Sequence, residues 1–486
     1  MSTASADRRG SARPLPLPDV LAAPHFPDAD SPGMAGLAAY LARRDSRVTI
    51  EPRPDGHRSD LLRHLDRTGA VLQPVDQRTT SLIWGGDNAA VPQILDLASG
   101  RGLPTMGHCR AMELLAATAP TVVAVAGSHS TATAAAALTC ALTVRDPGWI
   151  LNAAPRGDAP GYDGGGEVLV VDLCPDTALH EAAAPGRDHH ALGEGLRRAV
   201  TLVTAVDATP PAVATLENAL DEIEALARRS ESVVVWSSQP GCAELLERLR
   251  RTPGPRVVTV GRGDGMDVQV LRALWSGEDH RITLQADGER FAVTVPVTGT
   301  HDALGVAAAF AAGWALGLSG TDLADGLGAF PGVERSLTCL GTVGGVAVAE
   351  SYAQHPDEIA AAIQGAWMLT EGAVIAVYEP VGHLRTEALA ERIADALRGA
   401  NRTVVLPVHS TLSRSQCHAD GIEALARADF GGTLVIPGPG PCRPGPAVVA
   451  ASLARRGDLI LTIGPHAAPR IGPELLAALG LPRLAP

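Results

Sequence analysis

The chain has 486 residues, about three times the length of a typical single domain, which predicts two or three domains. Hydrophobic residues make up 46% and charged residues 19% of the chain, so it can build a large buried core and is not mainly disordered. The formal net charge of −13 argues against a nucleic-acid groove or an anionic membrane surface as the main partner.

The most informative feature of the composition is that lysine is absent, so that all 40 basic residues are arginine. No reaction that needs a lysine amine can take place on this chain. This excludes a Schiff base, a P-loop lysine and a carbamoylated lysine as a metal ligand. The seven cysteines lie far apart without a Cys-x-x-Cys pair, as is typical of free thiols in a reducing compartment.

No targeting segment and no membrane span are expected. Arg8 and Arg9 near the N-terminus are not followed by an apolar run. Two long uncharged stretches, residues 116–144 and 303–320, are either interrupted by Gly-Ser-His-Ser-Thr or only weakly apolar, so we expect both in protein cores. These features together predict a cytoplasmic protein that binds no nucleic acid.

The first folded unit is expected over residues 23–118, after a flexible polar arm at residues 1–22. Short apolar runs alternate there with helical segments, which predicts a small parallel α/β domain of the Rossmann type. Helices are expected over residues 33–42, 60–67 and 91–100, and strands over residues 47–52, 69–75 and 81–86.

The second unit, residues 119–333, opens with an apolar strand, a Gly/Ser loop and an Ala-rich helix. This order is the layout of a P-loop-type α/β domain. Further strands are expected over residues 167–173, 201–207, 232–238 and 256–261, a helix over residues 214–229, and a hairpin over residues 279–297.

The third unit, residues 334–486, is expected to open with a hairpin over residues 336–350 and to continue as a doubly wound, Rossmann-like sheet. Strands are expected over residues 373–380, 403–408, 433–438 and 458–464, and helices over residues 356–367, 387–400, 447–456 and 473–480.

The loop that opens the second unit is the main candidate site. Its residues are Gly127, Ser128, His129, Ser130, Thr131, Ala132 and Thr133. Backbone N–H groups and a helix N-terminus at such a point can bind an anion. A working P-loop has glycine and lysine where Ser130 and Thr131 stand, and loss of one such contact typically slows a reaction about a hundredfold to a thousandfold. Two interpretations stay open: a weakened anion site, and a plain turn whose Ser and Thr side chains cap the helix.

Seven segments, in order from about residue 25 to the C-terminus, resemble motifs of the ATP-dependent Mur ligase family. The most distinctive is ESYAQHPDEI, which is similar to the family's Asp-Asp-Tyr-Ala-His-His-Pro-x-Glu-Ile. The others are HFPDADSPGMAGLA, LPTMGHCRAMELL, AGSHSTATA, GTHDALGVA, GVERSL and YEPVGHLRT. The resemblance implies three α/β domains, the cofactors ATP and Mg²⁺, and the joining of an amino acid to a carboxylate through an acyl phosphate in peptidoglycan precursor synthesis.

The resemblance also assigns residues to roles. It places Asp172, His355 and Arg335 at catalytic positions. It assigns nucleotide contacts to the loop 127–133 and to His301, Asp302 and Arg385. The loop that holds the UDP-sugar in the family contains Asp28, Asp30 and Gly33 here.

Several of these positions depart from the family pattern. Carboxylates at Asp28 and Asp30 would repel a diphosphate. Asp172 is one methylene shorter than the family's magnesium-binding Glu, the family's metal-ligating His falls near Pro210, and Asp302 stands for an adenine-contacting Asn. We therefore predict no metal-binding set of residues, and expect ATP and Mg²⁺ only as far as the family implies them.

Two functional hypotheses follow. The favoured one is a protein with the Mur ligase scaffold whose ligase activity is lost or severely reduced. Such a protein would act by binding cell-wall synthesis or division proteins or an authentic Mur ligase. The alternative is an active carboxylate–amine ligase with an altered substrate, in which an arginine such as Arg335 or Arg385 replaces the P-loop lysine.

Overall fold

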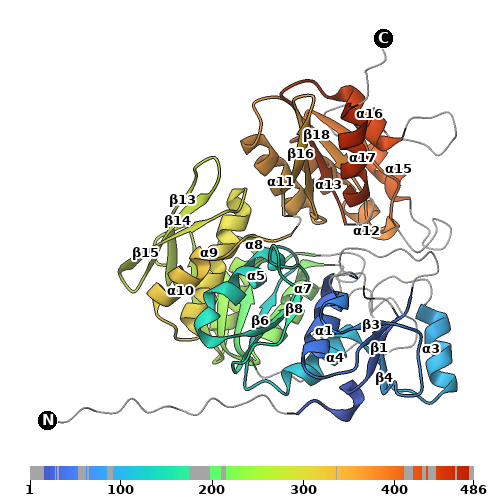
Figure 1. Ribbon diagram of the computed structural model, residues 1–486. Coiled ribbons are helices and arrows are strands. Elements are labelled where there is room, and N and C mark those ends of the chain that lie inside the picture. The colour runs from blue at the N-terminus through green and yellow to red at the C-terminus, as the bar shows by residue number, and fades with distance from the viewer. Residues whose placement is uncertain are drawn as a thin grey trace.

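The computed structural model describes residues 16–27, 29, 32–52, 62, 65–84, 91–173, 198–208, 215–334, 336–409, 420–428, 434–435, 445–465 and 468–480. The chain forms three sheets with helices packed on them, and each sheet lies within one of the three predicted residue ranges. Figure 1 shows the three units in separate regions, blue for the first, cyan to yellow for the second and orange to red for the third. The predicted α/β class is confirmed.

The N-terminal sheet is parallel and has the strand order β3-β2-β1-β4-β5. The order reverses between β1 and β4, which is where open α/β sheets of this kind bind ligands. The strands are β1 (Pro24–Phe26), β2 (Thr49–Ile50), β3 (Val71–Leu72), β4 (Ser81–Trp84) and β5 (Thr105–Gly107). The helices are α1 (Pro32–Arg43), α3 (Val91–Gly100) and α4 (His108–Ala116).

The expected flexible arm over residues 1–22 is wrong for its described end. Asp19–Leu21 forms a 3-10 turn, and the Leu21 side chain is fully buried. The Ser46 hydroxyl donates a hydrogen bond of 2.8 Å to the Leu21 carbonyl, so packing and hydrogen bonding both hold this segment to the sheet. The prediction of a flexible arm rested on the prolines and polar residues around Leu21, and a single apolar residue did not indicate burial.

Backbone contact joins the first unit to the second. Helix α1 packs against β7 (Gly148–Ile150) and β8 (Gly161–Tyr162) of the central sheet. A Cβ atom added at Gly161 in β8 would lie only 1.8 Å from the carbonyl oxygen of Gly36 in α1. Glycine at this position is therefore needed for the close approach of the two backbones.

The central sheet has ten strands in the order β15-β14-β13-β12-β11-β10-β6-β9-β7-β8. Its strands are β6 (Thr121–Ala126), β7 (Gly148–Ile150), β8 (Gly161–Tyr162), β9 (Val168–Leu173), β10 (Arg198–Val203), β11 (Ser230–Trp236), β12 (Arg256–Gly261), β13 (Val268–Trp275), β14 (His280–Ala286) and β15 (Glu289–Val295). Its helices are α5 (Thr131–Ala141), α7 (Leu216–Ala227), α8 (Pro240–Arg251), α9 (Thr300–Ala315) and α10 (Gly320–Gly328).

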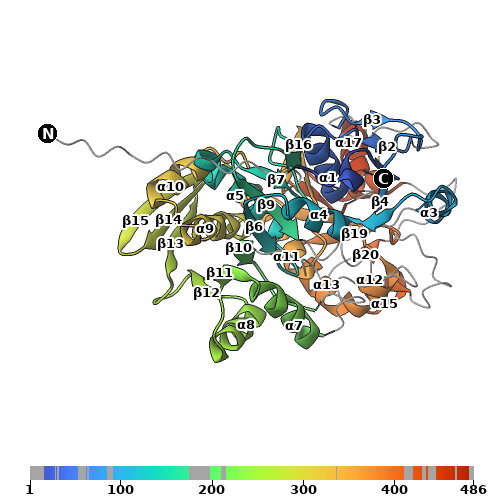
Figure 2. The same ribbon diagram turned by 90° about the horizontal axis from the view of Figure 1, so that it is seen from below.

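Helices cover both faces of this sheet, which explains its continuous apolar strands. In β11, Val234 packs into the core cluster that includes α5 and α9, whereas Val233 and Val235 pack against α7 and α8. Figure 2 shows α7 and α8 beside β11 and β12, with α5 and α9 on the other side of the sheet. Helix α8 and strand β13 were not predicted from the sequence.

The C-terminal sheet has the order β16-β17-β21-β18-β19-β20 and is parallel except for the β16–β17 hairpin. Its strands are β16 (Thr338–Val343), β17 (Val346–Ser351), β18 (Val374–Tyr378), β19 (Arg402–Val405), β20 (Leu434–Val435) and β21 (Leu459–Ile463). Its helices are α11 (Pro356–Met368), α12 (His383–Ala388), α13 (Ala390–Leu397), α15 (Gly421–Arg427), α16 (Pro446–Leu453) and α17 (Ala468–Gly480). The helix expected over residues 387–400 is present as α13, but its start was wrong, because the backbone breaks at Leu389 after the unpredicted α12.

Among the described residues, no helix is both long and apolar enough to cross a bilayer. The two uncharged stretches noted in the sequence instead supply buried parts of the central domain. Ala134–Leu138 of α5 and Ala303 of α9 are fully buried. The predicted cytoplasmic location stays a prediction.

Candidate functional site

The loop between β6 and α5 has the backbone shape of an anion-binding loop. Ser130 has left-handed backbone angles, φ 67° and ψ 19°, a conformation that glycine adopts most readily. A Cβ atom at Gly127 would lie 2.3 Å from Thr204 Oγ1, so the loop also passes very close to the end of β10. A strand, a left-handed residue and a helix N-terminus in this order direct backbone N–H groups towards one point.

The interpretation of this loop as a turn with a side-chain helix cap is wrong for Ser130. Ser130 is the N-cap of α5 but makes no side-chain capping bond. Its Oγ lies 2.6 Å from His129 Nδ1 instead. The hydroxyl is therefore used to hold the neighbouring imidazole, and the Ser130 N–H group is directed elsewhere.

A carboxylate of the C-terminal domain binds this N–H group. Ser130 donates a hydrogen bond of 2.9 Å to Glu358 Oε1. Glu358 Oε2 also accepts from the backbone N–H groups of Gln354 and His355, each at 3.2 Å. Burial raises the pKa of Glu358, but the imidazoles of His129 and His355 and the Ser130 N–H outweigh it and lower this pKa to about 2. The Glu358 carboxylate thus accepts a hydrogen bond from the N–H group that would bind a phosphate in a P-loop.

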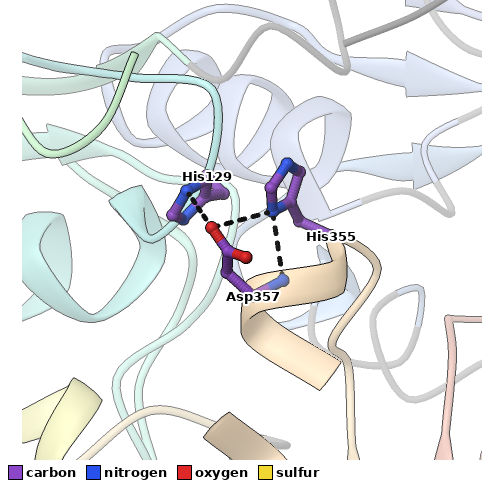
Figure 3. A group of neighbouring side chains, drawn as sticks. All are labelled: His129, His355 and Asp357. Atoms are coloured by element: carbon purple, nitrogen blue, oxygen red, sulfur yellow. Dashed lines mark hydrogen bonds and ion pairs between the residues drawn. The ribbon is translucent and has the colours of Figure 1, made fainter. Parts of the chain in front are cut away.

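Two histidines stack beside this contact. The rings of His129 and His355 are nearly parallel, with centroids 4.2 Å apart (Figure 3). Asp357 Oδ2 lies 3.4 Å from His129 Nε2 and 3.8 Å from His355 Nδ1. On the other edge of His355, Nε2 lies 3.4 Å from Asp207 Oδ2. Burial lowers the pKa of His355, and Asp207 opposes this shift.

The start of α11 holds these groups in place. The His355 side chain accepts from the Asp357 N–H at 3.3 Å, while the Glu358 side chain accepts from the His355 N–H, which together form a capping box. The helix predicted over residues 356–367 is confirmed as α11, with Asp357 and Glu358 in its first turn. Both acids also favour the helix dipole there.

Asp302 links the central and C-terminal domains near the same loop. Its Oδ1 accepts from Thr133 Oγ1 at 2.6 Å, and its Oδ2 accepts from Ser336 Oγ at 2.7 Å. Both oxygens of the residue that replaces the family's adenine-side Asn are thus engaged within the protein. Its neighbour His301 lies close enough to Glu358 to lower the pKa of that carboxyl.

Asp172, the residue expected to match a magnesium-binding Glu, is the penultimate residue of β9, which is the neighbour of β6 in the sheet. It is buried, and burial raises its pKa to about 6 against hydrogen bonds from Thr131 and Asn152. Asp172 Oδ1 is buried without a hydrogen-bond partner in the described part of the chain. Thr131, at the place of the P-loop lysine, opposes the rise in the pKa of this carboxyl.

The structure brings together most of the expected site. The loop, Asp172, His301, Asp302 and His355 surround the end of β6, and Arg385 lies in α12 of the C-terminal domain. The remaining positions belong to other places: Gly33 lies in α1, where its carbonyl is 3.3 Å from His108 Nε2, and Asp28, Asp30 and Arg335 lie outside the described residues.

Sequence reasoning missed two contributors, Asp207 and Arg392. Arg392 of α13 contacts Asp207 at 2.6 Å and Asp357 at 3.6 Å. Asp207 follows β10, and the carboxyl ends of parallel strands meet at one sheet edge, a signal that could have placed it near the loop. Arg392 is far away in sequence and carried no such signal, and the motif that contains Glu358 did not predict its contact with the loop.

The residues of the loop do not fit the contacts that a P-loop makes with MgATP. A P-loop lysine contacts the phosphates, and the next residue, a Ser or Thr, binds Mg²⁺ through its hydroxyl. Here these positions are Thr131 and Ala132, which supply neither a cation nor, at the second position, a hydroxyl. With Glu358 on the Ser130 N–H and Asp172 and Asp302 nearby, the loop is lined by carboxylates.

Comparison with known proteins identifies the lineage. No family model matches the chain. A UDP-N-acetylmuramate–L-alanine ligase of a Nocardioides species is 31% identical over 492 residues, which cover 96% of this chain and 99% of the relative. This chain belongs to the UDP-N-acetylmuramate–L-alanine ligase family, a branch of the Mur ligases. The enzyme of the same name from Streptomyces avermitilis is 29% identical over 95% of this chain and 98% of its own length.

Solved structures agree on the fold. A murein peptide ligase from Psychrobacter arcticus superposes with a TM-score of 0.70 at 16% identity, covering 95% of this chain and all of the other. A UDP-N-acetylmuramate–alanine ligase from Thermotoga maritima also gives a TM-score of 0.70 at 16% identity, covering 93% of this chain and 98% of its own. The family resemblance inferred from the motifs is confirmed.

Proposed function

We propose that this Mur-ligase-family protein of peptidoglycan precursor synthesis has lost most or all of its ATP-dependent ligase activity. It acts by binding, to proteins of cell-wall synthesis or division or to an authentic Mur ligase. The observation that carries the proposal is that Thr131 and Ala132 stand where a P-loop has its lysine and its metal-binding hydroxyl, while the Ser130 N–H donates a 2.9 Å hydrogen bond to Glu358 Oε1. A phosphate that used this loop would have to displace a carboxylate that two further N–H groups hold in place.

The magnitudes support a loss rather than a small reduction. Phosphoryl transfer depends mainly on positioning and on cations that neutralise the developing charge. Losing one such contact typically slows the reaction about a hundredfold to a thousandfold. The lysine at position 131 and the hydroxyl at position 132 are both replaced, and independent losses multiply, so we expect a rate lower by at least about ten-thousandfold.

The direct test is ADP formation. The purified chain is incubated with MgATP, UDP-N-acetylmuramate and L-alanine, beside the Streptomyces avermitilis relative as the active control. We expect no ADP above the protein-free blank from this chain, and no heat of MgATP binding by titration calorimetry. ADP release that depends on both substrates would contradict the proposal.

A gain-of-function series tests the reason for the loss. The variant Ser130→Gly/Thr131→Lys/Ala132→Thr restores the P-loop residues but leaves Glu358 on the loop. We expect it to bind MgATP weakly, and the same variant with Glu358→Gln to bind at least about tenfold more tightly, because the competing carboxylate charge is gone. Equal affinities would show that Glu358 does not compete with nucleotide.

The active-ligase alternative makes the opposite prediction. It requires saturable, magnesium-dependent ATP binding by the unmodified chain, and loss of that binding in Arg335→Ala or Arg385→Ala. The partner hypothesis is tested separately, by analytical ultracentrifugation of the chain mixed with the authentic ligase of the same organism. A complex in the absence of nucleotide supports a binding role, and two independently sedimenting species argue against this partner.

A further inference from the structure

The stacked histidines form part of a cluster that spans the central and C-terminal domains. His129 comes from the loop after β6, and His355 and Asp357 come from the start of α11 (Figure 3). One nitrogen or oxygen atom from each of the three residues can be chosen so that all lie within 4.8 Å of one another. His129 and His355 are 5% and 1% exposed, whereas the Asp357 side chain is 48% exposed.

The contacts around the cluster engage one polar atom of each residue on its outer side and leave a second atom, a possible metal ligand, directed towards the other two residues. His129 Nδ1 is engaged by Ser130 Oγ at 2.6 Å, which leaves Nε2. Asp207 Oδ2, 3.4 Å from His355 Nε2, favours the proton on Nε2, so that Nδ1 carries the lone pair, which accepts a 3.3 Å hydrogen bond from the Asp357 N–H. Arg392 lies 3.6 Å from Asp357 Oδ1, which leaves Oδ2. Metal-binding histidines typically have such a partner on the other ring nitrogen, which sets the tautomer and the ring orientation.

The charges around the cluster favour a divalent cation. Three carboxylates contact the histidine pair or lie beside it, those of Asp207, Asp357 and Glu358, while Arg392 supplies one positive charge. With neutral imidazoles, three negative charges less one positive charge leave two negative charges among these groups. One divalent ion would neutralise them.

We propose that His129 Nε2, His355 Nδ1 and Asp357 Oδ2 bind a zinc-class divalent metal ion, with Asp207 as a positioning residue and water completing the coordination. Zinc bonds of about 2.0–2.2 Å at tetrahedral angles place neighbouring donor atoms about 3.4 Å apart. The 3.4 Å and 3.8 Å distances from Asp357 Oδ2 to the two nitrogens are close to that value. Two imidazoles select a transition metal over Mg²⁺, which prefers oxygen ligands.

Binding requires a small rearrangement within the cluster. A metal ion lies in the plane of each imidazole that binds it, so the two stacked rings must tilt apart by rotation about their Cβ–Cγ bonds. His355 Nδ1 also gives up its 3.3 Å hydrogen bond from the Asp357 N–H, while Glu358 retains its half of the capping box. The ion then links the central domain to the C-terminal domain without any nucleotide. This inference does not depend on the proposed loss of ligase activity.

The test uses the full chain, stripped of metal with a chelator and titrated with ZnCl₂ by calorimetry. Co²⁺ serves as the spectroscopic probe, because a four-coordinate site with nitrogen ligands gives an intense visible absorption band. We expect one ion per chain. The variants His129→Asn and Asp357→Asn should each lower the zinc affinity at least about a hundredfold, and Asp207→Asn about tenfold.

Matched controls separate this site from others on the chain. Asp325→Asn removes an exposed carboxylate of α10 and should leave the zinc affinity unchanged. Asp357→Asn changes a side chain that is nearly half exposed, so it keeps the test usable if His129→Asn does not fold, which circular dichroism reports. The proposal is overturned if the chain binds no stoichiometric zinc, or if it binds zinc with the same affinity in the wild type and in Asp357→Asn.

Discussion

The contact between Glu358 and the loop before α5 can be tested by removing one charge. Glu358→Gln keeps the size of the side chain and its Oε1 acceptor, but it replaces the carboxylate with a neutral amide. The Oε1 atom can still accept from the Ser130 N–H, which lies 2.9 Å from it in the wild type. The amide nitrogen then faces the N–H groups of Gln354 and His355, which are donors themselves and lose their 3.2 Å acceptor.

The expected cost follows from these three hydrogen bonds. A hydrogen bond to a charged group contributes about 1.5–3 kcal/mol to stability, and a neutral one about 1 kcal/mol. Weakening one bond and losing two, with relaxation and water replacing part of the loss, destabilises the C-terminal domain by about 2–3 kcal/mol. At Ser130 alone the weakening is about 0.5–2 kcal/mol, which corresponds to roughly 2–30-fold in the opening equilibrium of that N–H.

Hydrogen exchange and urea unfolding measure the two effects separately. Mass spectrometry of the peptide that carries Ser130 should show its amide exchanging roughly 2–30-fold faster in Glu358→Gln than in the wild type. Urea unfolding should show the transition of the C-terminal domain shifted by about 2–3 kcal/mol. Glu371→Gln, at an exposed position of the same domain, is the matched control and should change neither. If Glu358→Gln behaves as this control does, Glu358 does not bind the loop.

Three further changes probe other parts of the structure. Ser130→Gly should be about 1 kcal/mol more stable than Ser130→Ala in chemical unfolding, because the left-handed backbone at this position strains any residue with a Cβ. Both variants lack the hydroxyl, so the comparison isolates the backbone, and equal stabilities would refute this strain. Burial lowers the pKa of His108 to about 4, so folding excludes a proton that the unfolded chain binds below pH 6.5. The contribution of this neutral histidine to the free energy of unfolding is complete above pH 6.5 and is lost towards pH 4. Between pH 7 and 4.5 the unfolding free energy of the wild type should therefore fall by about 2.5 kcal/mol more than that of His108→Gln. Parallel pH profiles of the two unfolding free energies would contradict this prediction. Gly161→Ala brings a methyl group against the Gly36 carbonyl and should destabilise the fold by about 3 kcal/mol or more. The control Gly263→Ala, with open space around it, should change the stability little. Similar melting temperatures for the two variants would show that α1 does not pack closely on β8.

The sheets could be predicted because their strands are local features of the sequence. The runs at Thr121–Ala126, Val168–Leu173 and Arg256–Gly261 are short and apolar. A strand that helices cover on both faces has a continuous apolar sequence, so such a run is enough to predict it. The break at Leu389 was missed because the apolar pattern continues through it. The Ser130 cap was wrong because a hydroxyl can also bond to a neighbouring side chain, here His129.

The site divides in the same way. The amino-acid sequence alone determined that no lysine reaches the loop before α5, and it identified the family through the order of its motifs, since both are properties of the chain read residue by residue. Only the tertiary structure decided which group the Ser130 N–H binds. Glu358 is 228 residues away, and its carboxylate reaches the loop because the third domain folds against the second. The local sequence around either residue does not indicate this contact, because the two segments meet only when whole domain surfaces pack against each other.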